Sequence, residues 1–262
     1  MRGGTILDVA DAAKHFAGLW AVAGASFSVT RGSITALIGP NGAGKTTMFD
    51  LLSGFARPDT GSIRLDGAEM AGLALHRIAR LGLVRTFQLT RVLAGMSVID
   101  NMLLAARRQP GESLPGLLAR PGRARAAEAE ASGRARALLE TFGLGGKAAA
   151  YAGTLSGGQR KLLEIARALM TEPEIVLLDE PMAGVNPTLG KAILEHIQAI
   201  RRARGTTFLF VEHDMDVVMA HADRVIVMAQ GRVISIGTPA EIRADAAVVA
   251  AYLGGLAPAG RA

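Results

Sequence analysis

Apolar residues along this chain fall into two alternating patterns, one typical of buried strands and one typical of helices. Short, almost wholly apolar runs such as 33–38 and 175–178 have the composition of strands in a buried parallel sheet. The predicted strands are residues 26–29, 33–38, 62–65, 175–178, 207–211 and 224–228. The predicted helices are residues 45–53, 158–170 and 187–204. Because strands alternate with helices, the pattern favours an α/β fold with helices packed on a parallel sheet.

A different pattern occupies the middle of the chain, from about Ile99 to Phe142. Ala, Leu, Arg and Glu dominate here, and prolines at positions 110, 115 and 121, with nearby glycines, interrupt the run. This composition predicts a helical segment with a loop in its middle, inserted into the α/β pattern as a subdomain. The last residues, Pro258–Ala262, read as a frayed tail.

Composition indicates a chain that folds around a sizeable core. It has 262 residues, of which 50% are hydrophobic and 20% are charged, and it has no cysteine. The lack of cysteine excludes a disulfide framework and a thiolate metal site. Asp8, Asp11 and Lys14 interrupt the beginning of the chain, and no run approaches the roughly 20 apolar residues that a membrane helix needs. We therefore expect a soluble protein.

The net charge of +6 raises nucleic acid, anionic lipid and an acidic protein surface as candidate partners. The basic residues are nevertheless scattered, apart from the arginines between Arg120 and Arg136 in an Ala-rich stretch. That stretch is better explained as a solvated helix face than as a nucleic-acid patch. Aromatic residues make up only 4% of the chain, which leaves little material for base stacking. No nucleic-acid partner is expected.

A glycine-rich segment between the predicted strand 33–38 and the predicted helix 45–53 fits the phosphate loop G-x-x-x-x-G-K-[ST]. Its residues are Gly39, Pro40, Asn41, Gly42, Ala43, Gly44, Lys45 and Thr46, followed by Thr47. The backbone N–H groups of such a loop, at the positive end of a helix dipole, bind phosphate oxygens. We expect Lys45 on the β- and γ-phosphates and the Thr46 hydroxyl on Mg²⁺. The full match in strand–loop–helix order argues against an ordinary glycine turn.

The apolar strand 175–178 ends in Asp179 and Glu180, which places both carboxylates at the carboxyl edge of the sheet. We expect Asp179 to hold Mg²⁺, directly or through water, and Glu180 to polarise the water that attacks the γ-phosphate. A strand that ends in Asp-Glu is common by itself. Together with the phosphate loop it identifies a P-loop NTPase, a class that includes kinases, GTPases and helicases.

The segment Leu155-Ser156-Gly157-Gly158-Gln159 narrows the class, because it resembles the signature motif of the ABC transporter ATPases. As in that family, it stands before a helix and shortly ahead of the strand that ends in Asp179. The Ser156 hydroxyl and the N–H groups of Gly157 and Gly158 are suited to hold a γ-phosphate. The resemblance implies that these residues, with Gln159, bind nucleotide across a dimer interface, opposite the phosphate loop of a second subunit.

The same resemblance implies further site residues. Gln88 matches the Q-loop glutamine, which reaches Mg²⁺ and water and links the site to the helical subdomain. His213 follows a predicted strand and matches the switch histidine that contacts the γ-phosphate. Phe16 matches the aromatic residue that stacks on adenine, with Trp20 as a competitor and an ordinary core aromatic as the plain alternative. Asn186 stands in the D-loop where many family members have Asp. The implied catalytic residues are Glu180, His213, Gln88 and Lys45.

The implied fold is a RecA-like P-loop NTPase core with an antiparallel β edge and an inserted α-helical ABC subdomain, in a single ABC ATPase domain of residues 1–262. The nucleotide-binding core is expected at 1–87 and 171–240, and the helical subdomain with the signature motif at 88–170. A C-terminal helix and tail are expected at 241–262. The implied cofactors are ATP and Mg²⁺.

The resemblance covers about Ile6 to Gly254 and is closest to the importer ATPases for branched-chain amino acids, the LivG type. The segments that carry it are residues 85–88, 96–101, 183–187, 212–216 and 251–254. It implies three kinds of partner: a second ABC ATPase subunit in a hetero- or homodimer, two membrane permease subunits, and a periplasmic or extracellular substrate-binding protein. The implied location is peripheral, on the cytoplasmic face of the cell membrane.

Two alternatives remain open at this point. One is the ATPase of an ABC exporter, and the other is a non-transport ABC ATPase that acts on nucleic acid or ribosomes. The sequence Arg85-Thr86-Phe87-Gln88 favours import, and the chain has neither the very long coiled coils nor the two cassettes of the non-transport members. A P-loop kinase is a remote alternative, because it gives no reason for Ser156–Gln159. No residue identifies the solute among leucine-like amino acids, urea and amides.

Overall fold

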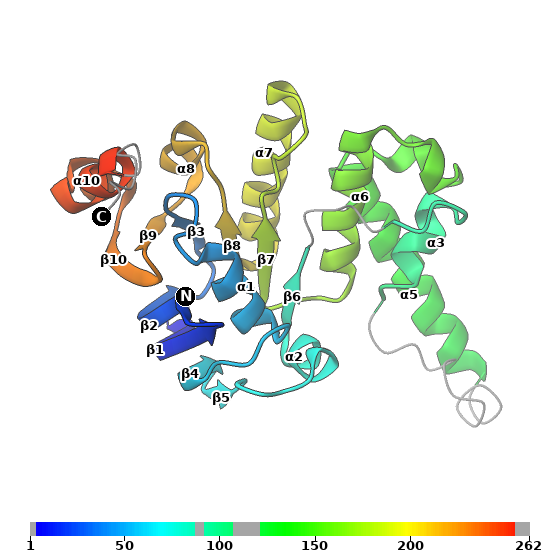
Figure 1. The fold of residues 1–262 in the computed structure, drawn as a ribbon. Helices are drawn as coiled ribbons and strands as arrows, with labels where there is room; N and C mark the ends of the chain where they lie inside the picture. Colours follow the sequence, from blue (N-terminus) through cyan, green and yellow to red (C-terminus); the bar gives the residue numbers. More distant parts are fainter. Residues whose placement is uncertain (1–3, 87–91, 107–120, 255–262) are drawn as a thin grey trace. The chain divides into compact units, whose positions relative to one another are not determined.

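The computed structural model describes residues 4–86, 92–106 and 121–254. Within these ranges the chain divides into two compact units. The first comprises residues 1–85, 174–181 and 199–262, and the second comprises residues 86–173 and 182–198. Both units are drawn in Figure 1, and each is described here by itself.

The first unit is built on a six-stranded sheet with the strand order β10-β9-β3-β8-β7-β6. Its strands are β3 (Ile34–Ile38), β6 (Leu83–Arg85), β7 (Ile175–Asp179), β8 (Thr207–Val211), β9 (Arg224–Ala229) and β10 (Arg232–Gly237). All neighbours pair in parallel except β9 and β10, which are antiparallel. Every residue of β3, β7 and β8 is buried, which explains their mostly apolar composition.

A second, antiparallel sheet with the order β2-β1-β4-β5 lies across helix α1 (Lys45–Ser53) from the first sheet (Figure 1). Its strands are β1 (Thr5–Phe16), β2 (Leu19–Thr30), β4 (Thr60–Leu65) and β5 (Ala68–Glu69). Met48, Phe49 and Leu52 of α1 are fully buried in one hydrophobic cluster with residues of both sheets. The helix that follows the glycine-rich loop is therefore fixed from two sides.

The remaining helices of the first unit are short. They are α2 (Leu75–Leu81), α8 (Met215–His221), α9 (Pro239–Ala244) and α10 (Ala246–Gly254). Helix α9 begins with a capping box, in which the Thr238 hydroxyl accepts from the Glu241 N–H and the Glu241 carboxylate accepts from the Thr238 N–H. Helix α7 (Pro187–Arg204) begins in the second unit and ends in the first.

The second unit is helical. It contains α3 (Val98–Leu103), α5 (Pro121–Thr141), α6 (Gly157–Met170) and the 3₁₀ turns Gly145–Lys147 and Ala152–Thr154. Its core includes Met102, Leu139, Phe142 and Leu163, each at most 1% exposed. Asn101 is also fully buried, and its amide group donates to the carbonyls of Leu93 and Ser97.

These elements confirm the predicted α/β class with a parallel sheet and a helical insert. The predicted helices 45–53 and 187–204 agree with α1 and α7, and the predicted strand 207–211 agrees with β8. The other predicted strands and helices of the α/β pattern, apart from 26–29, differ from the observed ones by one or two residues at one end. The prediction of a short strand at 26–29 was wrong in extent, because β2 spans twelve residues, and the equally long β1 was not predicted as a strand. The prolines at 110 and 115 and the tail Pro258–Ala262 lie outside the described residues.

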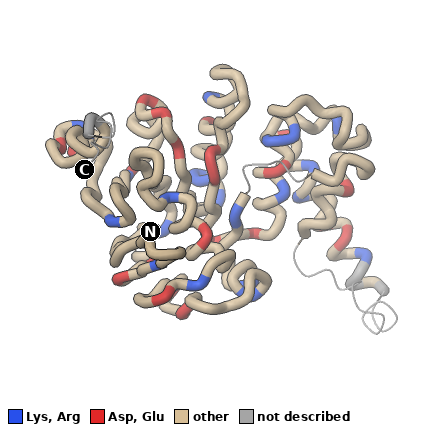
Figure 2. The backbone as a smooth tube through the Cα atoms, viewed as in Figure 1, with Lys and Arg blue, Asp and Glu red and all other residues tan. Residues whose placement is uncertain are grey.

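Basic and acidic residues are interspersed along the backbone of both units, as Figure 2 shows. Several basic side chains form ion pairs within the first unit: Arg31 with Asp66 and Glu174, each at 2.7 Å, and Arg201 with Asp223 at 3.0 Å. None of the helices in the described ranges combines the length and the apolar character required to cross a bilayer.

Candidate nucleotide site

The glycine-rich loop after β3 adopts a backbone that only glycine tolerates well. Gly39, Gly42 and Gly44 have φ angles of +152°, +76° and +98°. A Cβ atom on Gly39 would lie 2.0 Å from the carbonyl oxygen of Met228, and one on Gly44 would lie 2.3 Å from that of Ala21. Gly44 is the N-cap of α1 and offers no side-chain cap. The first N–H groups of α1 therefore remain available to bind an anion.

Lys45 is the first residue of α1 and is 6% exposed. Its ammonium group donates to the carbonyls of Gly39 at 2.7 Å and Pro40 at 3.0 Å, so the side chain folds back over the loop. Burial lowers the pKa of Lys45 below its usual value, and the negative charge of Glu180 acts in the opposite direction. An anion bound in the loop would compensate this buried cation.

A cavity of about 570 Å³ opens over the loop. It is lined by Leu19, Trp20, Ala21, residues 41–47, Glu180, His213 and Gln230, all of the first unit. Trp20 and Leu19 are half-exposed or more, and the Trp20 ring lies 5.1 Å from that of His15. Phe16 is not among the lining residues, although it is equally exposed. Of the two aromatic candidates for adenine stacking, Trp20 is the one at the cavity wall.

The strand β7 delivers two carboxylates to the edge of the sheet, as its sequence predicts. Asp179 ends the strand and is 7% exposed, and Glu180 follows with an unusual φ of +47°. The backbone N–H of Glu180 donates to the Val211 carbonyl at the end of β8, which fixes this conformation. A residue other than glycine keeps such a left-handed backbone only where the surrounding structure fixes it.

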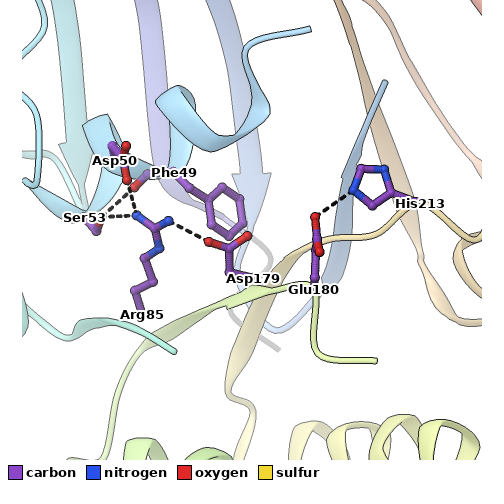
Figure 3. Close-up of polar contacts among 7 residues, drawn as sticks. All are labelled: Phe49, Asp50, Ser53, Arg85, Asp179, Glu180 and His213. Atoms are coloured by element: carbon purple, nitrogen blue, oxygen red, sulfur yellow. Dashed lines mark hydrogen bonds and ion pairs between the residues drawn. The ribbon is translucent and has the colours of Figure 1, made fainter. Parts of the chain in front are cut away.

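Glu180 and His213 form a close pair at the cavity (Figure 3). The Nε2 atom of His213 lies 2.7 Å from Oε1 of Glu180, and the two side chains are 48% and 20% exposed. When the Glu180 carboxylate is ionised it only accepts hydrogen bonds, and Nε2 of His213 is then the donor. His213 follows β8 and Glu180 follows β7, and because these strands are parallel neighbours, their carboxyl ends meet.

Arg85, at the end of β6, is a site residue that the sequence analysis did not identify. Figure 3 shows its guanidinium group between two carboxylates, with Nη1 2.6 Å from Oδ1 of Asp50 and Nη2 2.6 Å from Oδ2 of Asp179. Nη1 also lies 3.2 Å from the Ser53 hydroxyl. A basic residue at the end of a short strand is the signal that could have found it, but its acidic partners come from distant parts of the sequence.

Ser156 and Gln159 begin helix α6 in the second unit. They form a capping box, in which the Ser156 hydroxyl accepts from the Gln159 N–H at 3.2 Å and the Gln159 side chain accepts from the Ser156 N–H at 3.1 Å. Ser156 and Gly157 are exposed, and the hydroxyl proton of Ser156 stays free to donate. A Cβ atom on Gly158 would lie 2.0 Å from the end of the Leu189 side chain, so a larger residue here would displace that side chain.

Two further predicted positions have different outcomes. Gln88 lies outside the described residues, so its role stays a prediction. Asn186 is exposed, and its side-chain oxygen accepts from the Leu189 N–H at 2.8 Å, in the first turn of α7. This asparagine therefore caps a helix, as an aspartate at the same position can.

The donor set near the loop suits Mg²⁺ brought in by a polyphosphate. Thr46 offers an exposed hydroxyl in the first turn of α1, and Asp179 offers a carboxylate at the end of β7. Magnesium prefers oxygen ligands and is commonly held by one or two protein side chains together with substrate phosphates and water. The loop, the cation Lys45 and the Glu180–His213 pair together can bind a nucleoside triphosphate and direct water at its terminal phosphate.

Comparison with known proteins agrees with this geometry. The model of the ABC transporter family matches residues 22–183, and that of a branched-chain amino acid ATP-binding cassette transporter matches residues 232–257. The chain is 44% identical to the high-affinity branched-chain amino acid transport ATP-binding protein BraF of Pseudomonas aeruginosa, over 95% of this chain and 98% of the relative. It is 46% identical to LivG, of the same description, from Salmonella typhimurium, over 92% of this chain and 94% of the relative.

Solved structures give the same result. A nucleotide-free ATP-binding cassette from an ABC transporter superimposes with a TM-score of 0.80 at 36% identity, over 95% of this chain and 99% of that one. The ADP conformation of an ATP-binding cassette of an ABC transporter also has a TM-score of 0.80, at 34% identity, over 96% and 99% of the two chains. The predicted resemblance is confirmed, and this chain belongs to the ABC transporter family as one of its ATP-binding cassettes.

Proposed function

We propose that this chain binds and hydrolyses ATP to drive the uptake of branched-chain or related amino acids through separate permease subunits. The observation that carries the proposal is the cavity in which the phosphate loop, Lys45, Glu180 and His213 converge. The transported class follows from the relatives, which are named for branched-chain amino acid transport, and from the matching segment 232–257.

Each site residue has a distinct task in this proposal. The N–H groups of the loop and the Lys45 ammonium bind the β- and γ-phosphates, and Thr46 and Asp179 supply the protein oxygens for Mg²⁺. When bound, this ion neutralises charge on the phosphates. Trp20, or Phe16 as the family resemblance implies, stacks on the adenine. Gln88 is proposed to contact the metal and the attacking water.

Hydrolysis needs one water molecule and no covalent intermediate. Glu180 accepts a hydrogen bond from the water, whose oxygen attacks the γ-phosphorus while the bond to the oxygen of ADP breaks. The proton leaves the water through the carboxylate and ends on the products. His213 donates from Nε2 to Glu180, at 2.7 Å, and holds the carboxylate at the cavity wall. Positioning and charge stabilisation account for most of the rate in such reactions.

The complete site is proposed to require a second ATPase subunit. Ser156 and Gly157 are exposed at the N-terminus of α6, where they can meet the γ-phosphate held by another subunit's phosphate loop. The second subunit is either a related chain or another copy of this one. Two permease subunits, a periplasmic or extracellular substrate-binding protein and a peripheral position on the cytoplasmic face of the membrane complete the proposed assembly.

Reconstitution tests this function. The chain is co-expressed with the permease, sister-ATPase and binding-protein genes of its chromosomal neighbourhood, and the purified assembly is placed in liposomes with ATP inside. We expect leucine uptake that requires internal ATP and the binding protein, and that disappears when Lys45→Ala replaces the parent chain. Uptake that is independent of ATP, or an ATPase activity that responds to nucleic acid and not to the permeases, would refute the proposal. Outward movement of a lipid substrate would favour the exporter alternative.

A further inference from the structure

The guanidinium group of Arg85 joins three elements of the first unit next to Asp179, the proposed metal ligand. It forms ion pairs with Asp50 of α1 and with Asp179 of β7, both at 2.6 Å, and it is carried by β6. The Arg85 side chain is 8% exposed and that of Asp179 is 10% exposed, so water competes little for this contact. Asp50 is more accessible, at 37%.

Strand register explains why Arg85 reaches Asp179. Arg85 pairs with Leu177 in the parallel β6–β7 ladder, and neighbours in a ladder point to the same face of the sheet. Asp179 is two residues beyond Leu177, so its side chain also points to that face. A long side chain at position 85 therefore extends toward the carboxylate that ends β7.

Aromatic rings and a hydroxyl fix the guanidinium plane. Its central carbon lies 5.6 Å from the centroid of the Phe49 ring and 5.7 Å from that of Phe55. Nη1 also contacts the Ser53 hydroxyl, which in turn donates to the Phe49 carbonyl at 2.6 Å. A planar, forked cation that contacts two carboxylates and two aromatic rings is held in an orientation that a lysine ammonium could not reproduce.

From this geometry we propose that Arg85 is a positioning residue for metal binding: it holds Oδ2 of Asp179 and thereby orients the remaining carboxylate oxygen toward Mg²⁺. Ligand carboxylates are commonly fixed by such outer contacts, whose loss costs about 10- to 100-fold in metal affinity. The proposal rests on the assignment of Asp179 as a metal ligand in the proposed function. It adds that Arg85 contributes to the affinity for Mg-nucleotide without touching the nucleotide.

The test measures how strongly Mg²⁺ tightens nucleotide binding. Titration calorimetry gives the Kd of a non-hydrolysable ATP analogue with and without Mg²⁺, and the ratio of the two is the readout. For Arg85→Lys, which keeps the charge and loses the fork, we expect the ratio to fall about tenfold while the Mg-free Kd stays that of the parent. Arg31→Lys is the matched control, because Arg31 also bridges two carboxylates in the first unit, and it should leave both values unchanged.

Two more variants separate the possible failures. Asp179→Asn should lose most of the Mg²⁺ effect, and if it does not, the metal assignment in the proposed function is wrong whatever Arg85 does. If Asp179→Asn loses the effect but Arg85→Lys keeps the parental ratio, or weakens nucleotide equally with and without Mg²⁺, only the role of Arg85 is refuted. Asp50→Asn removes the other anchor of the guanidinium and should lower the ratio less, in the same direction. An unchanged ratio in that variant refutes the role of Arg85 even if Arg85→Lys fails to fold.

Discussion

Replacement of Glu180 by Gln is the most direct test of the hydrolytic site, because the structure predicts that it removes one function and little else. The backbone of Glu180 is fixed by its own N–H, which donates to Val211, and this bond does not depend on the side chain. Glutamine has nearly the same size, and its carbonyl oxygen can accept from Nε2 of His213 as the carboxylate does at 2.7 Å. The cavity should therefore keep its shape.

The magnitude distinguishes a general base from a structural contact. A positioned base contributes about 10²- to 10⁴-fold to the rate, which corresponds to about 2.7–5.5 kcal/mol at about 1.36 kcal/mol per tenfold. A hydrogen bond that merely supports the fold contributes about 0.5–1.5 kcal/mol to stability. Even if the whole of that energy were lost from the transition state, the rate would fall by about 13-fold at most. The nucleotide affinity should not fall, since the variant removes a negative charge close to the bound phosphates.

The assay combines two measurements on the chain purified together with its second ATPase subunit. Phosphate release under single-turnover conditions reports the chemical step, and titration calorimetry reports the Kd for Mg-ATP. We expect Glu180→Gln to bind like the parent and to release phosphate at least about 100-fold more slowly. Glu174→Gln, just before β7, is the control with the same chemical change, and it should lose only its ion pair with Arg31. A Glu180→Gln rate within about tenfold of the parent would show that Glu180 is not the base.

Three further predictions concern other parts of the chain. Trp20 is the only tryptophan and lines the cavity, so ATP binding should change the intrinsic fluorescence, whereas inorganic triphosphate should not. Unchanged emission at saturating ATP would contradict the stacking of Trp20 on the adenine. Gly44→Ala should lower the free energy of unfolding by more than Gly42→Ala does, because of these two positions only Gly44 has a carbonyl oxygen where the Cβ atom would lie. Gly42→Ala should cost only the strain of its left-handed backbone, about 1–2 kcal/mol. Equal losses of stability in urea unfolding would refute this prediction. Burial lowers the pKa of His196 below 6.5, so the unfolded state binds more protons just below pH 6.5, and stability should fall as the pH drops through this range. His196→Gln should flatten that decline in the urea midpoint, while a similar change at the exposed His76 should not.

The parts of the site that sequence predicts well are those in which neighbouring residues do the work. The phosphate loop is a run of consecutive residues, and its glycines at 39, 42 and 44 have the positive φ angles that the motif requires. The signature segment is also local, since Ser156 and Gln159 fold into a capping box three residues apart. In both cases the sequence pattern and the structure that it specifies lie within one short run of consecutive residues.

Contacts between distant elements could not be predicted in this way. Arg85 meets Asp50 and Asp179, which lie 35 and 94 residues away, only because β6, α1 and β7 are adjacent in the fold. The strand β1 was missed for a different reason. Its pairing with β2 is interrupted by several register shifts, and Asp11 has a φ of +49°, so buried positions do not alternate with exposed ones along it. Periodicity fails as a signal where a strand is bulged.

The order of strands in the six-stranded sheet determines which catalytic groups meet. The strands β3, β8, β7 and β6 lie next to one another in this order and run parallel. The loop that follows β3 and the residues that end β8, β7 and β6 therefore all lie at the carboxyl edge of the sheet. Asp179 pairs with Val211, so Glu180 and His213 leave adjacent strands within two residues of the same rung, and a shift of register by one residue would separate them. The left-handed backbone of Glu180 costs about 1–2 kcal/mol. The fully buried strands β7 and β8 offset this strain, and their pairing holds the Glu180 carboxylate at the cavity in the absence of nucleotide.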